Sequence, residues 1–432
     1  MADWKTVKLG DVADIIGGGT PDTKNDSYWG GDVPWLTPKD LSGYGSRYIS
    51  KGERNISYQG LENSSAKMLP AGSVLLTSRA PIGYVAIAKT PLCTNQGFKS
   101  LILKEDANSE FFYYLLKNNV DYIQGMSSGS TFAEISGSQI KALEFKIPPL
   151  DVQKRIAGIL GALDDKIEVL RAQNKTLEKM AQAVFQSWFV DFDIVRAKAA
   201  GLAAADVCKK YHITPDIYDL FPSAFSADNL PLGWEKIPFS ETMNIISGGT
   251  PKTTEPTFWN GEIPWYSVVD APASVYVLDT EKHITQQGLE KSPCSLLEKD
   301  TVIISARGTV GKLAVVGKQM AMNQSCYGLK FDFPYYGYLM TKQMLIGLKQ
   351  NVHGAVFDTI TKDTFKTVQT VNVSKNLKEA FTNIVSSFFK KIFENSKQIH
   401  TLEQTRDTLL PQLICGKLDV ENVSLSILDN RI

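Results

Sequence analysis

Histidine and cysteine are scarce in this chain of 432 residues, and neither type clusters. The four histidines, His212, His283, His353 and His400, are scattered, so no metal-binding cluster and no Ser-His-Asp arrangement is evident. The five cysteines lie far apart and form no C-x-x-C pair, which is typical of reduced thiols in the cytoplasm. We therefore expect a cytoplasmic protein without a metal site.

Net charge and long apolar runs are absent as well. Lysine plus arginine and aspartate plus glutamate number 46 each, so the formal net charge is zero. This balance argues mildly against a protein that binds DNA unaided, although it does not exclude a local basic surface. The start of the chain has no apolar signal region, and no apolar run approaches the roughly 20 residues that span a bilayer. We expect no membrane association.

The common nucleotide and catalytic motifs are also missing. No G-x-x-x-x-G-K-[ST] phosphate loop occurs, and the stretch 308–312 resembles one only in part. The stretch 332–335 differs at one position from the D-P-P-Y of amino-methyltransferases and has no F-x-G-x-G cofactor loop. Neither Pro-Asp pair, at 21–22 and 215–216, precedes the acid-x-Lys of a nuclease. We therefore expect no catalytic centre and no cofactor in this chain.

What the sequence does contain is one unit written twice. Six of the seven tryptophans form three pairs with an offset of 230 residues: Trp4, Trp29 and Trp35 recur as Trp234, Trp259 and Trp265. The motif Trp-x-Gly-[Asp/Glu]-[Val/Ile]-Pro-Trp covers 29–35 and 259–265. Because tryptophan is rare, this match does not arise from composition. Whatever the protein does, we expect it to act at two equivalent places.

Each copy carries the patterns of a compact α+β domain. The runs 73–77 and 301–305 are typical of buried strands, and 84–88 and 312–316 follow them after turns that contain glycine. A short helix is expected around 111–118, with a counterpart near 338–349. We place the two domains at residues 1–147 and 231–372.

A heptad pattern follows each copy. In 156–188 two interleaved rows of apolar residues recur every seven residues, with Asn174 as the polar member, and 381–413 repeats the pattern with Asn395 and Arg406. Such a period, held for about five heptads, predicts long helices within 148–194 and 373–420. A connector at 195–230 and a tail at 421–432 complete the chain. The alternative is that each helix packs only on its own domain.

A tandem repeat of domain and helix can close with approximate two-fold symmetry, which makes the two helices antiparallel. With the midpoints of 156–188 and 381–413 opposite each other, Asn174 faces Asn395, and a buried asparagine pair is a device that fixes register. The expected fold is therefore α+β, with two repeated globular domains joined by two long helices in an antiparallel coiled coil of pseudo-two-fold symmetry.

This layout resembles the specificity subunit of type I DNA restriction-modification systems. The resemblance covers nearly the whole chain and rests on the tryptophan motif, on Ser78-Arg79 with Gly83 and Asn95-Gln96 downstream, and on the stretches 147–153 and 409–418. One departure is that 371–375, at the start of the second helix, lacks the Pro-Pro and the Gln of the first. Equal docking of partners at both helix ends is therefore not implied.

The resemblance implies a subunit that is not an enzyme and that binds double-stranded DNA. Each repeat, as a target-recognition domain, would recognise one half of a split site, while the helices set the spacing and dock two modification (methyltransferase) subunits. Restriction subunits, which are ATP-dependent translocases and nucleases, would then join. S-adenosylmethionine, ATP and Mg belong to those partners, which can also share the phosphate contacts that a neutral chain lacks. The competing interpretation is a non-enzymatic two-domain coiled-coil scaffold that binds protein or glycan.

Residues shared by the two copies have both a structural and a DNA-binding interpretation. The four motif tryptophans are expected to anchor the core or a loop. An arginine follows an equivalent strand in each copy and either contacts phosphate or forms a structural ion pair, and an Asn-Gln pair either contacts DNA or caps a turn. These shared candidates are Arg79, Arg307, Asn95, Gln96, Asn323 and Gln324.

If the two halves recognise different sequences, base-contacting residues should lie where the copies diverge. The strongest divergence is 41–66 against 271–294, and Arg and Gln in such stretches can recognise guanine and adenine in the major groove. A solvated polar loop is the alternative. The candidates here are Tyr44, Arg47, Lys51 and Arg54 in the first copy, Lys282, His283, Gln286 and Gln287 in the second, and Ser128, Thr131 and His353 in later loops.

Overall fold

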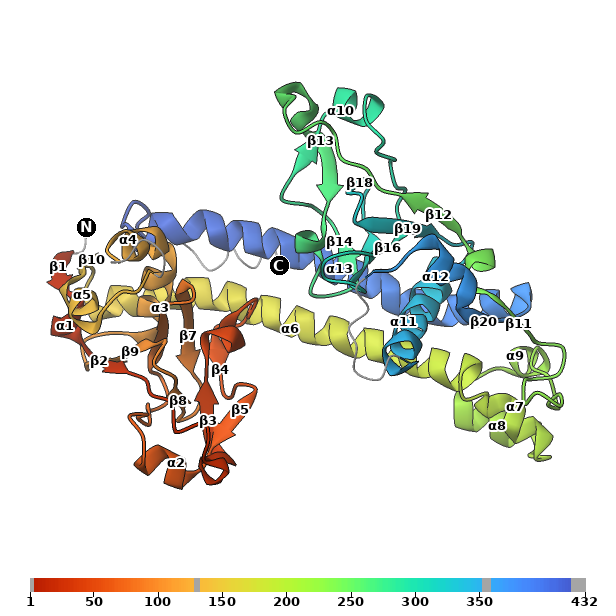
Figure 1. Ribbon diagram of the computed structural model, residues 1–432, viewed down its shortest axis with the longest axis horizontal. Coiled ribbons are helices and arrows are strands. Elements are labelled where there is room, and N and C mark those ends of the chain that lie inside the picture. Colours follow the sequence, from red (N-terminus) through yellow and green to blue (C-terminus); the bar gives the residue numbers. More distant parts are fainter. Residues whose placement is uncertain (1–3, 128–132, 352–358, 421–432) are drawn as a thin grey trace. The chain divides into compact units, whose positions relative to one another are not determined.

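The computed structural model describes residues 4–127, 133–351 and 359–420. The chain divides into two compact units, residues 1–168 with 401–432 and residues 169–400 (Figure 1). Each unit contains one repeat domain together with a part of each long helix. Within the described ranges, no helix combines the length and the apolar character needed to cross a bilayer.

The first domain combines short strands with short helices. In chain order its elements are β1 (Lys5–Lys8), α1 (Leu9–Val12), β2 (Ala13–Gly17), β3 (Trp29–Leu36), β4 (Tyr48–Ile49), β5 (Arg54–Ile56), α2 (Tyr58–Glu62), β6 (Val74–Ser78), β7 (Ile82–Ala88), β8 (Cys93–Thr94), β9 (Lys99–Leu103), α3 (Ser109–Asn118), α4 (Val120–Gly125), α5 (Gly137–Ala142) and β10 (Glu144–Ile147). Single 3₁₀ turns cover Asp26–Tyr28 and Pro38–Leu41.

Two sheets form the framework of this domain. The larger has the strand order β2-β9-β6-β7-β4, and the smaller has the order β5-β3-β8. Strand β6 is buried along its whole length, as its unbroken apolar run requires, and it pairs antiparallel with β7 and β9. The strands predicted at 73–77 and 84–88 are thereby confirmed. The smaller sheet carries α2 at the end of the domain remote from the long helices (Figure 1).

A separate two-stranded pairing joins the two ends of the domain. Strand β1 runs antiparallel to β10, with Lys5 opposite Ile147 and Lys8 opposite Glu144. The chain therefore enters and leaves the domain at one place, directly before the first long helix.

The second domain repeats this plan. Its elements are β11 (Glu235–Pro238), β12 (Asn244–Ser247), β13 (Trp259–Tyr266), β14 (Tyr276–Val277), β15 (His283–Ile284), α10 (Gln286–Glu290), β16 (Val302–Ser305), β17 (Leu313–Val316), β18 (Ala321–Met322), β19 (Cys326–Lys330), α11 (Pro334–Asn351), α12 (Lys362–Thr367) and β20 (Gln369–Asn372), with 3₁₀ turns at Phe239–Thr242, Pro256–Phe258 and Val268–Asp270.

The sheet orders of the second domain match those of the first, strand for strand. They are β12-β19-β16-β17-β14 and β15-β13-β18, and β11 pairs with β20 as β1 pairs with β10. Strands β16 and β17 confirm the predictions at 301–305 and 312–316. Helix α11 is longer than its counterpart α3, as the expected span of 338–349 indicated.

The two long helices are α6 (Leu150–Phe189) and α13 (Lys375–Ile414), and they are antiparallel in each unit. In the first unit Asp164 of α6 pairs with Arg406 of α13 at 2.8 Å. In the second unit the Asn395 Nδ2 donates to the Asn174 Oδ1 at 2.9 Å, and both side chains are buried. The predicted asparagine pair and the antiparallel register are therefore confirmed.

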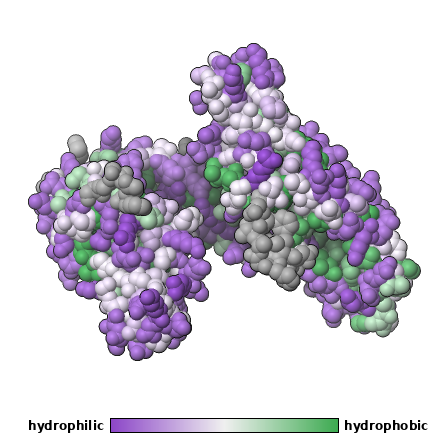
Figure 2. All heavy atoms as spheres, viewed as in Figure 1, coloured by the Kyte–Doolittle hydropathy of each residue, from purple (hydrophilic) through white to green (hydrophobic). Residues whose placement is uncertain are grey.

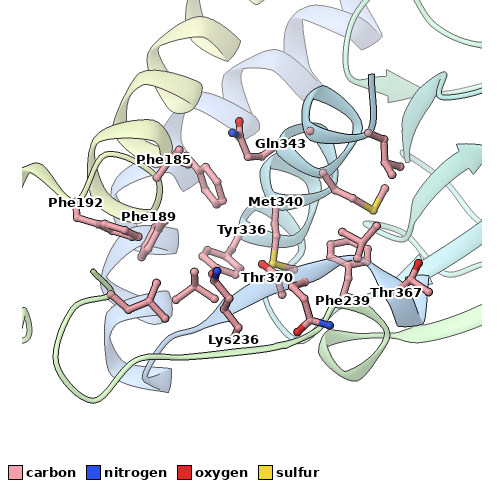
Figure 3. Close-up of a pocket in the computed structure, with 18 residues that line it drawn as sticks. Phe185, Phe189, Phe192, Lys236, Phe239, Tyr336, Met340, Gln343, Thr367 and Thr370 are labelled. Carbon is pink, nitrogen blue, oxygen red and sulfur yellow. The ribbon is translucent and has the colours of Figure 1, made fainter. Parts of the chain in front are cut away.

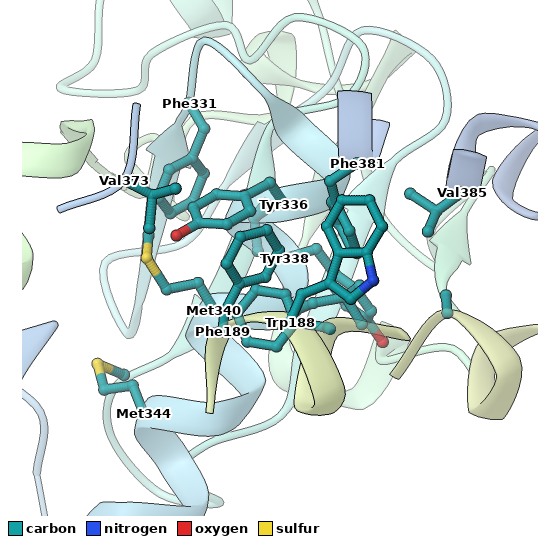
Figure 4. Packing of buried hydrophobic residues seen from close by; sticks show 14 of the residues in the cluster. Trp188, Phe189, Phe331, Tyr336, Tyr338, Met340, Met344, Val373, Phe381 and Val385 are labelled. Carbon is teal, nitrogen blue, oxygen red and sulfur yellow. The ribbon is translucent and has the colours of Figure 1, made fainter. Parts of the chain in front are cut away.

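The core of the second unit gathers aromatic residues around the end of α6. Trp188 and Phe189 contact Phe381 of α13 edge-to-face, with ring centroids 5.8 and 5.1 Å apart (Figure 4). Phe189 also meets Tyr336 of α11 at 5.1 Å. The connector folds onto this cluster as α7 (Asp193–Ala199), α8 (Ala204–Tyr211) and α9 (Pro215–Asp219), contributing buried side chains such as Val195. The helix pair and the domain therefore share one core in this unit.

Candidate nucleic-acid interface

The motif tryptophans build the smaller sheet of each domain. Trp35 is buried and donates from Nε1 to the carbonyl of Gly19 at 2.9 Å, while Trp29 packs edge-to-face on it with ring centroids 5.1 Å apart. Trp265 and Trp259 repeat both features, with a 3.0 Å bond to Gly249 and a centroid separation of 5.2 Å. The expectation that these tryptophans anchor core and loop is confirmed.

A short helix is held at the same place on both scaffolds. The Ser57 hydroxyl caps α2 by accepting from the amide of Gly60 at 3.0 Å, and Thr285 caps α10 in the same way. A Cβ at Gly60 would lie 2.5 Å from the carbonyl of Tyr28, so only glycine allows this close packing. The first residue of each helix is exposed, and it is Tyr58 in α2, where the exposed fraction is 65%, and Gln286 in α10.

Arg54 is the candidate that the first domain presents most directly. It is exposed at the start of β5, and its guanidinium lies over the ring of Trp29, 3.7 Å from the centroid. Stacking fixes the plane of the guanidinium and leaves its N–H edge available to an acceptor. Its counterpart is Lys282, which is exposed directly before β15. The surface over α2 and α10 is mainly hydrophilic in the face shown by Figure 2.

The other divergent candidates have mixed surroundings. Lys51 and Gln287 are exposed, and the Gln286 amide donates to Glu290 at 2.8 Å. His283 Nε2 lies 3.0 Å from the Asp279 carboxylate, which also pairs with Lys318. Burial alone would raise the pKa of Asp279, but Lys318 and His283 hold it below its usual value. This carboxylate therefore stays charged and orients His283.

Tyr58 belongs to the divergent, basic and tyrosine-rich stretch 41–66, but it was not one of the candidates chosen from that stretch. Alignment of α2 with α10 supplies the signal, because Tyr58 and Gln286 occupy the same helix position. The same alignment matches Gln287 with Gln59. Gln287 therefore does not differ between the copies, contrary to the expectation that base-contacting residues diverge.

The structure corrects the assignment of Arg47. Only 3% of its side chain is exposed, because the guanidinium binds Asp165 of α6 and the Tyr114 hydroxyl, at 3.3 Å from the latter. Burial alone would lower its pKa, but Tyr114, Asp165 and Glu110 raise the pKa of Arg47 and keep it charged. A guanidinium enclosed in this way has no free edge for a base. Tyr44, which is 41% exposed, lies close to the same junction, and its hydroxyl donates to the carbonyl of Tyr48 at 2.5 Å. Burial and the nearby Glu168 of α6 raise the pKa of Tyr44.

The shared asparagine and glutamine candidates form hydrogen bonds within turns and loops. The Asn95 side chain accepts from the amide of Gly97 at 2.9 Å, and Gln96 accepts from the Thr20 hydroxyl. Asn323 and Gln324 repeat these bonds in the second domain. Turn capping, the alternative considered from the sequence, is what these asparagines do.

The two arginines of the shared turn differ in their partners. Arg79 Nη1 lies 3.4 Å from the Glu134 carboxylate, which is also 4.0 Å from Lys99. In the second domain the backbone of exposed Arg307 pairs with that of Thr359, which occupies the position of Glu134. At this position the second turn therefore has a threonine hydroxyl where the first has a carboxylate. The candidates Ser128, Thr131 and His353 lie outside the described residues.

A cavity of about 580 Å³ lies in the second unit. It is lined by residues of α6, α11 and β20, among them Phe185, Tyr336 and Met340, and by Lys236 of β11 (Figure 3). None of the candidate residues is part of this lining. In the described ranges, no three His, Cys, Asp or Glu side chains gather as a metal site would require.

The fold defines a class of protein with two equivalent α+β domains, each packed against segments of the same two long helices. The family described as the type I restriction modification DNA specificity domain matches residues 1–179 and 231–404. This chain therefore belongs to the specificity subunits of type I restriction-modification systems.

Individual relatives agree over almost the full length. The chain is 34% identical to the type I restriction enzyme MjaIX specificity subunit of Methanocaldococcus jannaschii, over 98% of this chain and 95% of that one. It is 26% identical to the HindI specificity subunit of Haemophilus influenzae, over 97% and 100%. The crystal structure of the type I S subunit from M. genitalium has the same fold, with a TM-score of 0.52 at 17% identity over 95% and 96% of the two chains.

Proposed function

We propose that this specificity subunit recognises a bipartite DNA site, with each domain contacting one half and the two long helices setting the gap. The observation that carries this proposal is one scaffold presenting different side chains in the two copies. Arg54 and Tyr58 on the first domain correspond to Lys282 and Gln286 on the second. Two equivalent surfaces with different hydrogen-bonding groups suit two different half-sites.

The chain supplies recognition, and we assign the chemistry to its partners. Two methyltransferase subunits would dock on the helices and bring S-adenosylmethionine, and restriction subunits would bring ATP and Mg. The neutral charge of this chain supports such sharing, because phosphate contacts from partners would provide the electrostatic part of DNA affinity.

Mapping of methylated motifs in cells tests the division between the domains. The variants Arg54→Lys and Tyr58→Gln give the first domain the residues of the second, and Lys282→Arg and Gln286→Tyr are the matched reverse changes. Each pair should alter one half of the motif only, by about 1–3 kcal/mol for every bidentate pair of hydrogen bonds to a base that the substitution removes. A continuous wild-type motif, or a variant that alters both halves alike, refutes the proposal.

A second experiment tests the non-catalytic role. The purified chain with S-adenosylmethionine and cognate DNA should transfer no methyl groups, and transfer should begin when the methyltransferase subunits are added. DNA binding by that complex should weaken steeply with salt, since contacts to phosphate release counterions. Methyl transfer by the isolated chain contradicts the assignment of chemistry to the partners.

A further inference from the structure

We propose that Arg47 is a positioning residue, which holds the first domain on α6 in one orientation and thereby restricts the gap between half-sites that the complex accepts. The inference rests on the proposed bipartite recognition. It concerns a side chain that the sequence favoured for base contact and that the structure encloses at the junction of domain and helix.

Arg47 lies directly before β4, and its guanidinium bridges α6 and α3. One Nη binds the Asp165 carboxylate, and the other lies 3.3 Å from the Tyr114 hydroxyl and 3.9 Å from Glu110. Its backbone amide donates to Glu168 at 3.2 Å. Two carboxylates of α6 and two side chains of α3 therefore surround one residue of the domain.

The surface of α6 is shaped to receive this guanidinium. A Cβ placed on Gly161 would lie 2.4 Å from the Arg47 Nη1, so the helix has a glycine where the side chain passes. One face of the guanidinium also lies 5.1 Å from the ring centroid of Tyr48, whose hydroxyl donates to Glu110. The contact is therefore both charged and closely fitted.

The same network continues to the second long helix. The Tyr114 hydroxyl donates to the Asp164 Oδ2 at 2.6 Å, and the Asp164 Oδ1 accepts from Arg406 of α13 at 2.8 Å. Tyr114 is fully buried and Asp164 is 7% exposed. The orientation of the first domain is thus linked through Tyr114 to both helices of its unit.

Among its described residues, the second unit has no counterpart of the Arg47 cluster at the equivalent place. Its ionic contact between domain and helix lies instead on α11, where Tyr338 and Lys342 bind Glu178 of α6 at 2.7 and 2.5 Å. The position of Arg47 is taken by Val275, which is fully buried. Tyr276 packs edge-to-face on Phe393 of α13 at 5.1 Å, and Tyr335 stacks on Phe389 at 4.4 Å. Phe389 and Phe393 occupy on α13 the positions that Asp164 and Glu168 occupy on α6.

The directional contacts of Arg47 predict a low tolerance to rotation of the first domain at this junction. Charge-assisted hydrogen bonds to a planar guanidinium are directional, whereas ring contacts accept a range of angles. The α2 surface lies at the end of the domain remote from α6 (Figure 1), so a small rotation at the junction moves that surface by a larger distance. The ionic junction therefore limits where the first half-site can lie.

The test uses the full chain in complex with its methyltransferase subunits. The wild-type motif supplies two half-sites, which are placed in duplexes whose gap is lengthened or shortened one base pair at a time, and methylation rates are compared. Arg47→Val introduces the residue of the second copy, Arg47→Lys keeps the charge without the fork, and Lys89→Val removes an exposed lysine of the same domain as the control.

We expect Arg47→Val to reduce the preference for the best gap by about tenfold, equivalent to about 1.4 kcal/mol, with the bases of both half-sites unchanged. Arg47→Lys should restore part of that preference, and Lys89→Val should behave as wild type. An unchanged gap profile in a folded Arg47→Val complex overturns the inference. So does a change of the bases recognised at an unchanged gap, because Arg47 would then contact DNA.

Two further arms keep the result interpretable. If Arg47→Val does not fold, Asp165→Asn is measured on the same duplexes, where a broader gap profile supports the inference and a wild-type profile overturns it. The wild-type arm tests the proposed function separately. Wild-type protein with a continuous motif or no gap preference refutes bipartite recognition itself, before any variant is considered.

Discussion

Replacing Asn395 with leucine removes one member of the buried asparagine pair and leaves the Asn174 Oδ1 without its donor. Among the residues that the structure describes, only Asn395 donates to the Asn174 Oδ1, at 2.9 Å. Asn174 is 1% exposed. A buried acceptor left without its donor costs about 1–3 kcal/mol. For a unit of this size, each kcal/mol lowers the melting temperature by roughly 2–4 °C, so Asn395→Leu should lower it by several degrees.

The double variant separates pairing from the mere removal of polar groups. The Asn395 Oδ1 is already buried without a hydrogen-bond partner, so the pair is not fully satisfied as it stands. Leucine at both 174 and 395 removes both buried side-chain amides and adds apolar contact between the two long helices. We therefore expect the double variant to be more stable than either single variant, with less control over helix register.

Thermal unfolding of wild type, both single variants and the double variant completes the cycle, and a coupling energy above about 0.5 kcal/mol is expected for groups in contact. Additive effects, in which the double variant loses as much stability as the two single variants together, would refute the argument. They would mean that the asparagines do not depend on each other.

The remaining predictions use contacts of the first unit. Gly161→Ala should lower the melting temperature, because the new Cβ would lie 2.4 Å from the Arg47 guanidinium. Gly158→Ala meets open space and should stabilise the helix by roughly 0.5–1 kcal/mol. Thermal unfolding that ranks the two variants the other way contradicts the close packing of Arg47 on Gly161. Trp35→Phe leaves a carbonyl without its donor and should cost about 1–3 kcal/mol in the same assay, and an unchanged melting temperature argues against the anchor. Exposed Cys415 should react with iodoacetamide at pH 8 far faster than Cys93, whose burial raises its pKa to about 11 and keeps the thiolate scarce, so that equal labelling rates in the native protein are the contrary result.

Features with a strong local or periodic signal were predictable from the sequence. The heptads of 156–188 and 381–413 specify their own partner face, and matching their midpoints places Asn174 opposite Asn395, as the structure has them. The apolar runs at 73–77 and 301–305 become central strands because they can be buried on both faces.

The role of Arg47 was not predictable in the same way. A basic and tyrosine-rich stretch has the composition of a nucleic-acid contact, while the carboxylates of α6 that enclose Arg47 lie more than a hundred residues later in the chain. Such a long-range ion pair leaves no periodic pattern. The available signal was its alignment with Val275, since an apolar residue at the equivalent position indicates that the site faces inward.

The pairing of β1 with β10, and of β11 with β20, has a consequence for how such chains diversify. Because each domain begins and ends at one point beside its helix, a gene exchange with breakpoints in those strands transfers the whole domain as a cassette and preserves the helix pair. The ionic junction adds a restriction on inheritance. A domain with arginine at position 47 matches the helix that carries Asp165. In the place of the second domain, the same arginine would be buried beside Phe393 of α13.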